Sequence, residues 1–396
     1  MNNQQEQDSI KDKEISTFPW YYKNHFELWK SIAFNQKEQR LTCRATDNKQ
    51  NPKIYTIMKL ITIKENANYN NLLKEVFFLS IFKKNKYFID IIDVFLSENN
   101  QDNKKNKKMY IIIRKEGQSL LDLIRFNEGD YNKKYPYLSR YMIFQLVCGL
   151  KILHNLGFSH NDIKLGNILN IGTSKIKICD LGSADKNGKK HGVGTNGYFS
   201  PQNLLGYNRT KEDDMFAVGI VYTQLLQKKQ GGMLIDDQKE EMNKPKKNRK
   251  EIKKETILKG ILKNFYRIKI DGSDWDEDIN YNEIIKFIKN GEYNKFEDEP
   301  KWEYEFFKGI NNEEDKDLIK KLLEIDPKKR SKAEDVLNMD MFKKLNFTFE
   351  QSEVNYKEKD YQKYFGEETT SEATFRKHLE EIKEKFIGHV IFEKNN

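Results

Sequence analysis

The chain has 396 residues and a formal net charge of +9, with 37% hydrophobic and 33% charged residues. This length allows one large domain or two modest domains. No apolar run approaches the ~18 residues that a membrane-spanning helix needs, so we expect no membrane partner. The cysteines have no metal-binding or disulfide spacing, which favours a reducing compartment. The charge suits an anionic partner, but lysine is abundant throughout the chain and accounts for it equally well.

The first part of the chain predicts a small sheet with one helix. Residues 26–63 alternate between short apolar runs and polar turns, as the strands of a hairpin sheet do. Residues 70–84 have the apolar spacing of a helix. Residues 87–97 and 109–117 predict two further strands, joined by a solvated loop at 98–108.

Helical spacing dominates from about residue 120. Residues 139–157 form an amphipathic pattern that Gly157 ends, and residues 371–386 are another helix candidate. The stretch 227–254 is almost entirely polar and predicts a surface insertion. The pattern therefore predicts an α+β fold, in which a small antiparallel-sheet lobe with one helix precedes a larger, mainly helical lobe.

The stretch HNDIKLGNIL, residues 160–169, carries polar side chains at fixed offsets in a turn before a strand. In such a loop Asp162 can accept the proton of a hydroxyl group, and Asn167 can bind a magnesium ion. Lys164 between them can neutralise charge on a moving phosphoryl group. KICDLG follows and places Asp180 in a turn after a strand, and carboxylate and amide oxygens are suitable ligands for Mg²⁺.

These two segments resemble the catalytic and metal-binding loops of the protein kinase family. Three further matches follow in the family's order, namely VGTNGYFSPQ (193–202), EDDMFAVGIVYTQLL (212–226) and DPKKRSKAEDVL (326–337). The resemblance covers residues 25–345 and implies the two-lobed kinase fold. Lys164, two residues after Asp162, is typical of serine/threonine kinases.

The resemblance also implies a domain organisation. Residues 25–116 would form the N-lobe, and residues 117–345 the C-lobe with a polar insertion at 227–257. Residues 1–24 would be a disordered tail. Residues 346–396 would be a C-terminal tail, which is available to a regulatory partner.

Site residues follow position by position from the same resemblance. Asp162 would orient the substrate hydroxyl and take its proton, and Lys164 would contact the γ-phosphate of ATP. Asn167 and Asp180 would hold Mg²⁺. Asp214 would anchor the catalytic loop.

The nucleotide would be held mainly by the small lobe. Ile113 would guard the back pocket, and the backbone from Arg114 to Glu116 would bind adenine, with Leu169 as a further nucleotide contact. Glu75 on the first helix would pair with the lysine of a strand; the alternative is a solvated helix carboxylate.

That strand lysine has two candidate positions in YTIMKLI, residues 55–61. If Lys59 is the phosphate-binding lysine, Ile57 takes the small residue's place above adenine and crowds the roof of the site. If Thr56 takes that place, Met58 stands where the lysine is expected, because side chains alternate along a strand. We favour Lys59; in the other register Lys37 or Arg40 would substitute for it.

The glycine-rich phosphate loop of the family is missing. Asn35, Lys37 and Arg40 stand at the glycine positions, and no glycine occurs between Trp20 and Gly117. Side chains there hinder the close approach of backbone N–H groups to phosphate. Lys37 and Arg40 still offer positive charge to a phosphate.

Three departures concern the large lobe, and the first two belong together. Asn161 stands where many kinases have an arginine that holds a phosphorylated residue, and residues 184–194 contain no Ser, Thr or Tyr. Without a phosphate such an arginine has no partner, so the two departures are consistent with each other. Thr195 matches a threonine that hydrogen-bonds Asp162. Gln202 replaces the glutamate that pairs with the family's arginine, here Arg330.

The most direct interpretation is a serine/threonine protein kinase that uses ATP and Mg²⁺ to phosphorylate a protein hydroxyl. The alternative is a pseudokinase scaffold that binds partner proteins with weak or no ATP turnover. We expect no nucleic-acid partner, because no nucleic-acid-binding motif accompanies the charge. We expect a cytoplasmic location, with the basic stretch 244–254 as the feature that would favour the nucleus.

Overall fold

The computed structural model describes residues 26–35, 40–47, 54–64, 67–101, 104–126, 137–172, 174–188, 194–227, 258, 281–295, 307, 309–366 and 371–388. The chain divides into two compact units. The first comprises residues 1–117 and 352–396, and the second comprises residues 118–351. In the part of the chain that the structure describes, no helix is long and apolar enough to cross a membrane.

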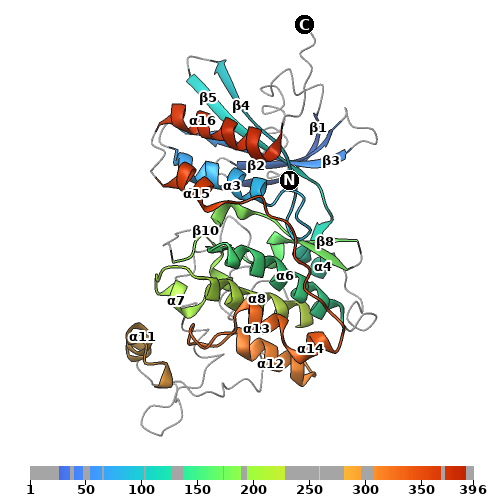
Figure 1. The fold of residues 1–396 in the computed structure, drawn as a ribbon, viewed down its shortest axis with the longest axis vertical. Helices are drawn as coiled ribbons and strands as arrows, with labels where there is room; N and C mark the ends of the chain where they lie inside the picture. The colour runs from blue at the N-terminus through green and yellow to red at the C-terminus, as the bar shows by residue number, and fades with distance from the viewer. Residues whose placement is uncertain are drawn as a thin grey trace, which may run out of the picture. The chain divides into compact units, whose positions relative to one another are not determined.

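The first unit is built on a five-stranded antiparallel sheet with the strand order β1-β2-β3-β5-β4 (Figure 1). Its strands are β1 (Phe26–Asn35), β2 (Arg40–Asp47), β3 (Ile54–Ile63), β4 (Ile91–Gln101) and β5 (Lys104–Arg114). Helix α3 (Tyr69–Ile81) begins where the Asn68 side chain accepts a hydrogen bond from the backbone N–H of Asn71. The prediction of a small sheet with one helix is confirmed, and the structure places that helix between the third and fourth strands.

The prediction of a solvated loop at residues 98–108 is wrong. The pairing of Ser97 with Lys108 continues to Gln101 with Lys104, so β4 and β5 form one long hairpin. Cross-strand backbone hydrogen bonds satisfy the peptide groups here whatever the side chains are, and they outweigh the low strand propensity of Asn and Lys.

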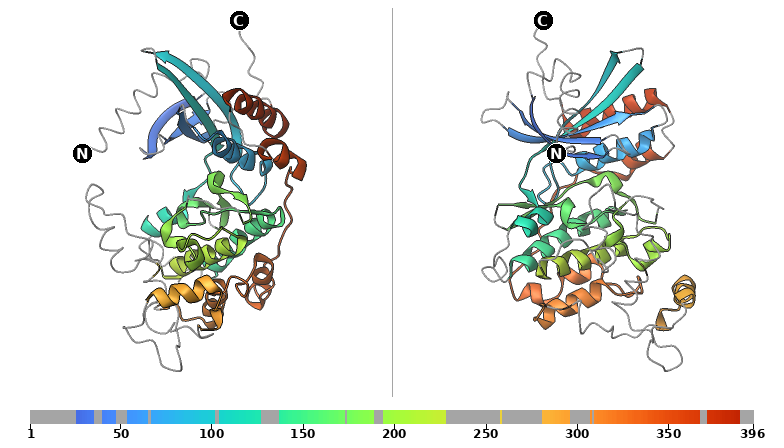
Figure 2. Two further views of the ribbon diagram at one scale, coloured as in Figure 1. Left: turned by 90° about the vertical axis from the view of Figure 1, so that its left-hand side faces the viewer. Right: turned by 180° about the vertical axis from the view of Figure 1, so that it is seen from behind.

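The C-terminal residues add a helical layer to the first unit. Helices α15 (Glu358–Phe365) and α16 (Glu372–Ile382) and the π-helical turn η6 (Lys383–Ile387) follow one another, and α16 lies against α3 (Figures 1 and 2). The Phe77 ring of α3 contacts five aromatic rings of this segment at centroid distances of 5.3–6.4 Å, those of Tyr356, Tyr361, Tyr364, Phe365 and Phe386. Every residue from Leu72 to Ile81 is consequently buried.

The second unit is mainly helical. Its first elements are β6 (Gln118–Ser119), α4 (Leu120–Phe126), α6 (Leu138–Asn155), β7 (Phe158–Ser159), η1 (Leu165–Asn167), β8 (Ile168–Ile171), β9 (Lys175–Ile178), η2 (Leu181–Ser183) and β10 (Asp185–Lys186). The later ones are η3 (Asn196–Tyr198), α7 (Pro201–Leu204), α8 (Lys211–Gln227), α11 (Tyr281–Asn290), η5 (Tyr293–Lys295), α12 (Glu313–Leu322), α13 (Ala333–Leu337) and α14 (Asp340–Lys343). The predicted α+β fold class is thus confirmed.

Helix α8 is the centre of the second unit. It packs against α6 and α12, and a Cβ atom at Gly219 would lie 2.7 Å from the Leu323 side chain. Glycine therefore allows the close helix packing that fixes the base of the catalytic loop. The predicted tail 1–24 and nearly all of the predicted insertion 227–257 lie outside the described residues.

Candidate active site

Asp162 is the centre of a hydrogen-bonded cluster in the loop between β7 and η1. Its Oδ2 atom lies 2.6 Å from Nζ of Lys164 and accepts a hydrogen bond of 2.9 Å from Nδ2 of Asn167. Its Oδ1 atom accepts a hydrogen bond of 2.8 Å from the Thr195 hydroxyl. The structure therefore brings together the three residues predicted to be catalytic, and it confirms the predicted contact between Thr195 and Asp162.

Thr195 links the loop to the segment before α7. Its hydroxyl donates to Asp162 and accepts a hydrogen bond of 2.9 Å from Nζ of Lys164. The hydroxyl is therefore engaged on both its donor and its acceptor side. These contacts orient the Asp162 carboxylate and place a positive charge beside it.

A backbone hydrogen bond holds the segment of Asn167 against the segment of Asp180. The N–H group of Cys179 donates to the carbonyl of Asn167 over 2.9 Å, and Asp180 follows in a left-handed conformation with φ 62°. The Nδ2 group of Asn167 donates to the backbone carbonyl and to the carboxylate of Asp162. The Asn167 side-chain oxygen is therefore not the atom that contacts Asp162, and an amide oxygen together with a carboxylate would fit a hard cation such as Mg²⁺.

The Asp214 carboxylate anchors the catalytic loop from α8, as predicted. Its oxygens accept hydrogen bonds from the backbone N–H groups of His160 at 2.7 Å and Asn161 at 2.8 Å. His154 Nε2 lies 2.9 Å from the same carboxylate. Burial acts to raise the pKa of Asp214, but the hydrogen bonds and the histidine charges outweigh it and hold this pKa below its ordinary value.

In the first unit, Lys59 of β3 and Glu75 of α3 form an ion pair with an Nζ–Oε1 distance of 2.6 Å. Glu75 is only 1% exposed, so it is not the solvated helix carboxylate that the sequence left open. Met58 is buried on the neighbouring position of the strand. Lys59, and not Met58, is therefore the residue that meets Glu75.

The residues expected to contact adenine occupy two places. Ile113 is buried on β5 opposite Ile57, and Arg114 ends that strand with its N–H group donating to the Asp90 carbonyl over 2.9 Å. Glu116 follows three residues after Ile113, with an oxygen 3.9 Å from the Arg114 guanidinium. Leu169 belongs to the second unit, on β8. Their roles in nucleotide binding stay predictions.

The Arg330 side chain is fully buried in the second unit. Its Nη2 atom donates to Gln202 Oε1 over 3.2 Å, and its Nη1 atom lies 3.7 Å from Asp213. The guanidinium also donates to the backbone carbonyls of Glu212 and Glu324. The sequence showed that Gln202 replaces the charged partner of Arg330, and this neutral amide accepts a hydrogen bond from the guanidinium, but the sequence did not reveal that Asp213 supplies the opposite charge.

The model of the protein kinase domain matches residues 41–342, most of the chain. The chain belongs to the protein kinase family. Its kinase domain is 38% identical over 94 residues to a serine/threonine kinase NLK of Caenorhabditis elegans, which covers 22% of this chain and 15% of that protein. It is 25% identical over 201 residues to the stress-activated protein kinase JNK of Drosophila melanogaster, covering 50% of this chain and 51% of that kinase.

Another relative is mitogen-activated protein kinase 4 of Oryza sativa, with 38% identity over 96 residues, 23% of this chain and 26% of that kinase. The chain thus spans between about a seventh and half of the length of these curated kinases. The resemblance read from the sequence to the protein kinase family is confirmed.

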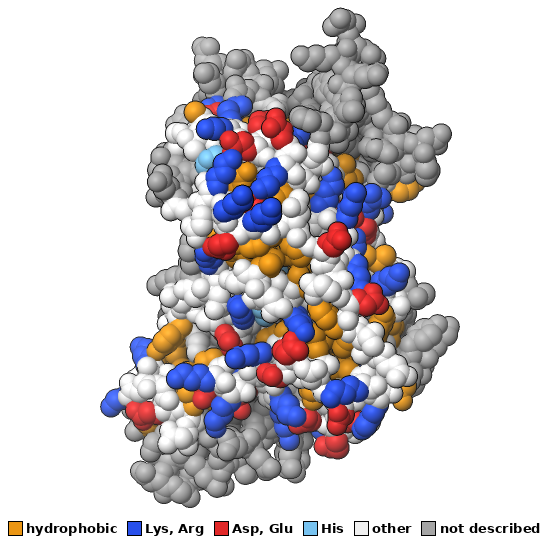
Figure 3. All heavy atoms as spheres, in the orientation of Figure 1, with side chains coloured by type: hydrophobic (Ala, Val, Ile, Leu, Met, Phe, Trp, Pro, Cys, Tyr) orange, Lys and Arg blue, Asp and Glu red, His pale blue; other side chains and the backbone are white. Residues whose placement is uncertain are grey.

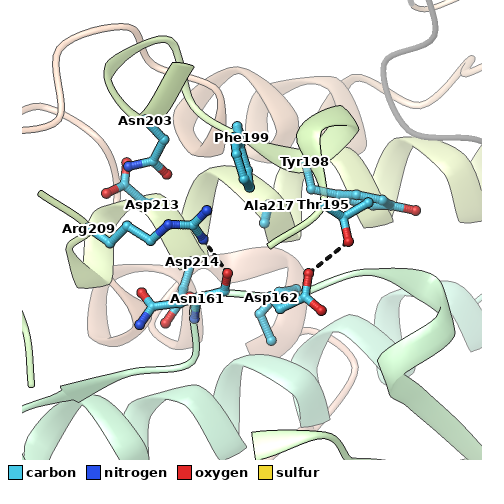
Figure 4. A pocket seen from close by; sticks show the side chains of 11 residues that line it. Asn161, Asp162, Thr195, Tyr198, Phe199, Asn203, Arg209, Asp213, Asp214 and Ala217 are labelled. Atoms are coloured by element: carbon cyan, nitrogen blue, oxygen red, sulfur yellow. Dashed lines mark hydrogen bonds between the residues drawn. The ribbon is translucent and has the colours of Figure 1, made fainter. Parts of the chain in front are cut away.

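The kinase domain contains a small hollow beside the catalytic loop that sequence reasoning missed (Figure 4). Tyr198, Phe199 and Arg209 line it beside Asp162 and Thr195. Burial raises the pKa of the Tyr198 phenol to about 12, while its hydrogen bond to Gln224 acts in the opposite direction. Tyr198 is therefore a neutral group at physiological pH. Spacing carries no signal for these residues, because they meet the loop only in the folded chain.

Proposed function

We propose that this kinase domain transfers the γ-phosphoryl group of Mg-ATP to a serine or threonine hydroxyl of a protein substrate. The observation that carries the proposal is the Asp162 carboxylate, held by Thr195, Lys164 and Asn167. A carboxylate fixed in this way can orient a substrate hydroxyl and take its proton as the phosphoryl group leaves ATP.

The other residues support the same chemistry. Lys164 offers its ammonium group to the charge of the transferred phosphoryl group, and Asn167 and Asp180 have the oxygen atoms that would hold Mg²⁺. When bound, the metal supplies charge neutralisation to the ATP phosphates. Lys59, oriented by Glu75, is the proposed partner of the inner phosphates.

Protein substrates are proposed because the curated relatives are serine/threonine and mitogen-activated protein kinases. We propose no nucleic-acid partner, because no nucleic-acid-binding motif accompanies the charge. On the face shown in Figure 3, the Lys and Arg side chains of the described residues are interspersed with Asp and Glu over most of the surface and gather more closely in the upper part. We propose a cytoplasmic location; the basic stretch 244–254 lies outside the described residues.

The C-terminal tail is proposed to act within its own chain. Its aromatic residues surround Phe77, and the backbone N–H of Asn355 donates to the Ile81 carbonyl over 3.0 Å. Lys383 adds an ion pair of 3.0 Å with the buried Asp93. These contacts hold the helix that carries Glu75 and the neighbouring strand β4, so the tail that was expected to be available to a regulatory partner is proposed to serve its own chain.

Asp162→Asn tests the proposed function, because it removes the proton acceptor and keeps the size of the side chain. We expect phosphoryl transfer to fall by at least roughly a hundredfold, while the thermal shift caused by Mg-ATP remains. Equal transfer by the wild type and Asp162→Asn, in preparations free of contaminating kinase, would refute the proposed enzymatic activity. If the wild type shows no transfer, the pseudokinase scaffold is favoured. The missing glycines of the phosphate loop support that alternative.

A further inference from the structure

The guanidinium of Arg209 lies buried beneath the catalytic loop, in the segment between α7 and α8. Arg209 is 5% exposed, and its Nη1 atom donates a hydrogen bond to the backbone carbonyl of Asn161 (Figure 4). This carbonyl belongs to the peptide bond that joins Asn161 to Asp162. Arg209 therefore contacts the peptide plane that immediately precedes the Asp162 side chain.

The opposite side of this backbone is held by Asp214. Its carboxylate accepts the N–H groups of His160 and Asn161, while Arg209 donates to the carbonyl of Asn161. Asn161 itself has a φ of 67°, in the left-handed region. Such a strained backbone conformation persists where several surrounding contacts fix it. Here the Asp214 carboxylate binds the two backbone N–H donors, and the Arg209 guanidinium binds the carbonyl acceptor.

The same guanidinium contacts the segment that carries Thr195. Its central carbon lies 4.2 Å from the centre of the Phe199 ring. A Cβ atom at Gly194, which has a φ of 144°, would lie 2.6 Å from Nη2 of Arg209. Only glycine therefore leaves room for the arginine at this position. Arg209 is packed between the catalytic loop and residues 194–199.

Among the residues that the structure describes, Arg209 forms no direct ion pair, because no carboxylate oxygen lies within 4.0 Å of its nitrogens. Burial lowers the pKa of Arg209, while Asp213, Asp214 and Asp162 act at longer range to raise it. A desolvated cation that donates to a carbonyl forms a stronger hydrogen bond than a neutral donor would. The arrangement is therefore suited to fixing a backbone orientation.

We propose that Arg209 is a positioning residue for phosphoryl transfer, which fixes the Asn161–Asp162 peptide plane and the Thr195 segment around the Asp162 carboxylate. This inference rests on the proposed kinase activity. Because Arg209 touches the loop behind the carboxylate, its loss should lower kcat and leave the KM for ATP nearly unchanged.

The test compares Arg209→Met and Arg209→Lys with Arg140→Lys. Arg140 is equally buried, at 5% exposure, but its contacts are Asp315 at 2.7 Å and Glu314 at 3.0 Å on α12. We expect Arg209→Met to lower kcat per folded molecule at least tenfold, with the KM for ATP within twofold. Arg209→Lys should restore part of kcat, because lysine can donate to the carbonyl but cannot stack on Phe199. Arg140→Lys should lower the thermal midpoint and leave kcat unchanged.

A second readout does not depend on activity. Hydrogen exchange of peptides covering residues 159–163 and 194–199 should be at least about tenfold faster in Arg209→Met and unchanged in Arg140→Lys. Unchanged exchange and unchanged kcat in Arg209→Met would overturn the role of Arg209, as would a Lys variant no better than Met. Absence of transfer by the wild type would instead overturn the proposed function, and exchange would still report on the loop.

Discussion

Nζ of Lys59 lies 2.6 Å from Oε1 of Glu75, and Glu75 belongs to a helix that is buried from Leu72 to Ile81. The strand sequence allowed either Met58 or Lys59 at this position. The pairing of β3 with its neighbours sets Lys59 opposite Ile111 of β5 and Thr42 of β2. The sheet register therefore decides which side chain meets α3.

Lys59→Met should weaken ATP binding roughly tenfold to a hundredfold, since hydrogen bonds to charged groups contribute about 1.5–3 kcal/mol. Met58→Leu is the matched control, because it conserves volume on the same strand and should change affinity less than twofold. Calorimetric titration with Mg-ATP measures both. An unchanged dissociation constant in Lys59→Met would show that this lysine does not bind the nucleotide.

Phe386→Ala tests the C-terminal layer. The Phe386 ring packs edge-on against Phe77 at 5.9 Å, and truncating a buried phenylalanine costs about 3–5 kcal/mol. We expect a loss of unfolding free energy in this range and weaker ATP binding, because α3 carries Glu75. Tyr55→Ala removes a ring that is 52% exposed on β3 and should change stability by no more than about 0.5 kcal/mol. Urea denaturation that ranks the two variants equally would contradict the role of the tail.

Activity should not depend on phosphorylation of residues 184–194, which contain no hydroxyl side chain. Thr195, next to this stretch, uses its hydroxyl for Asp162 and Lys164. Phosphatase treatment of the purified kinase should therefore leave the rate within about twofold. A loss of tenfold, about 1.4 kcal/mol of barrier, that is traced to this segment would contradict the expectation.

Asp214→Asn should reduce stability in a pH-dependent way. The pKa of Asp214 is held below its ordinary value, so its contribution is present above about pH 4 and is lost as the pH falls through the folded-state pKa. The asparagine variant should lose about 1.5–3 kcal/mol at pH 7, and its deficit should shrink towards pH 3.

Urea midpoints across this pH range measure the effect. The control is Asp317→Asn, whose carboxylate forms an exposed i,i+4 pair with Lys321, 2.7 Å apart, and should matter little at any pH. A deficit of Asp214→Asn that stays constant from pH 7 to pH 3 would show that its charge does not anchor the loop.

The sequence predicted much of the local structure correctly. Residues 70–84, predicted to form a helix, contain most of α3, and residues 139–157 contain all of α6 except its first residue, because apolar periodicity reports the buried face of a helix directly. The prediction from the sequence was wrong at residues 98–108, where hydrogen bonding between the two strands of a hairpin outweighs the polar composition. The cluster of Asp162, Lys164 and Asn167 could be predicted from the sequence, because all three residues lie within one short loop.

By itself, the sequence determined the order of the motifs, the catalytic-loop residues and the absence of hydroxyl groups from 184–194. These features depend on local spacing, which a chain carries before it folds. The tertiary structure alone decided that Arg209 reaches the Asn161 carbonyl, that Asp213 accompanies Arg330, and that the C-terminal aromatic residues surround Phe77. These contacts join residues far apart in the chain, and they form because burial of apolar surface and pairing of buried polar groups act in three dimensions.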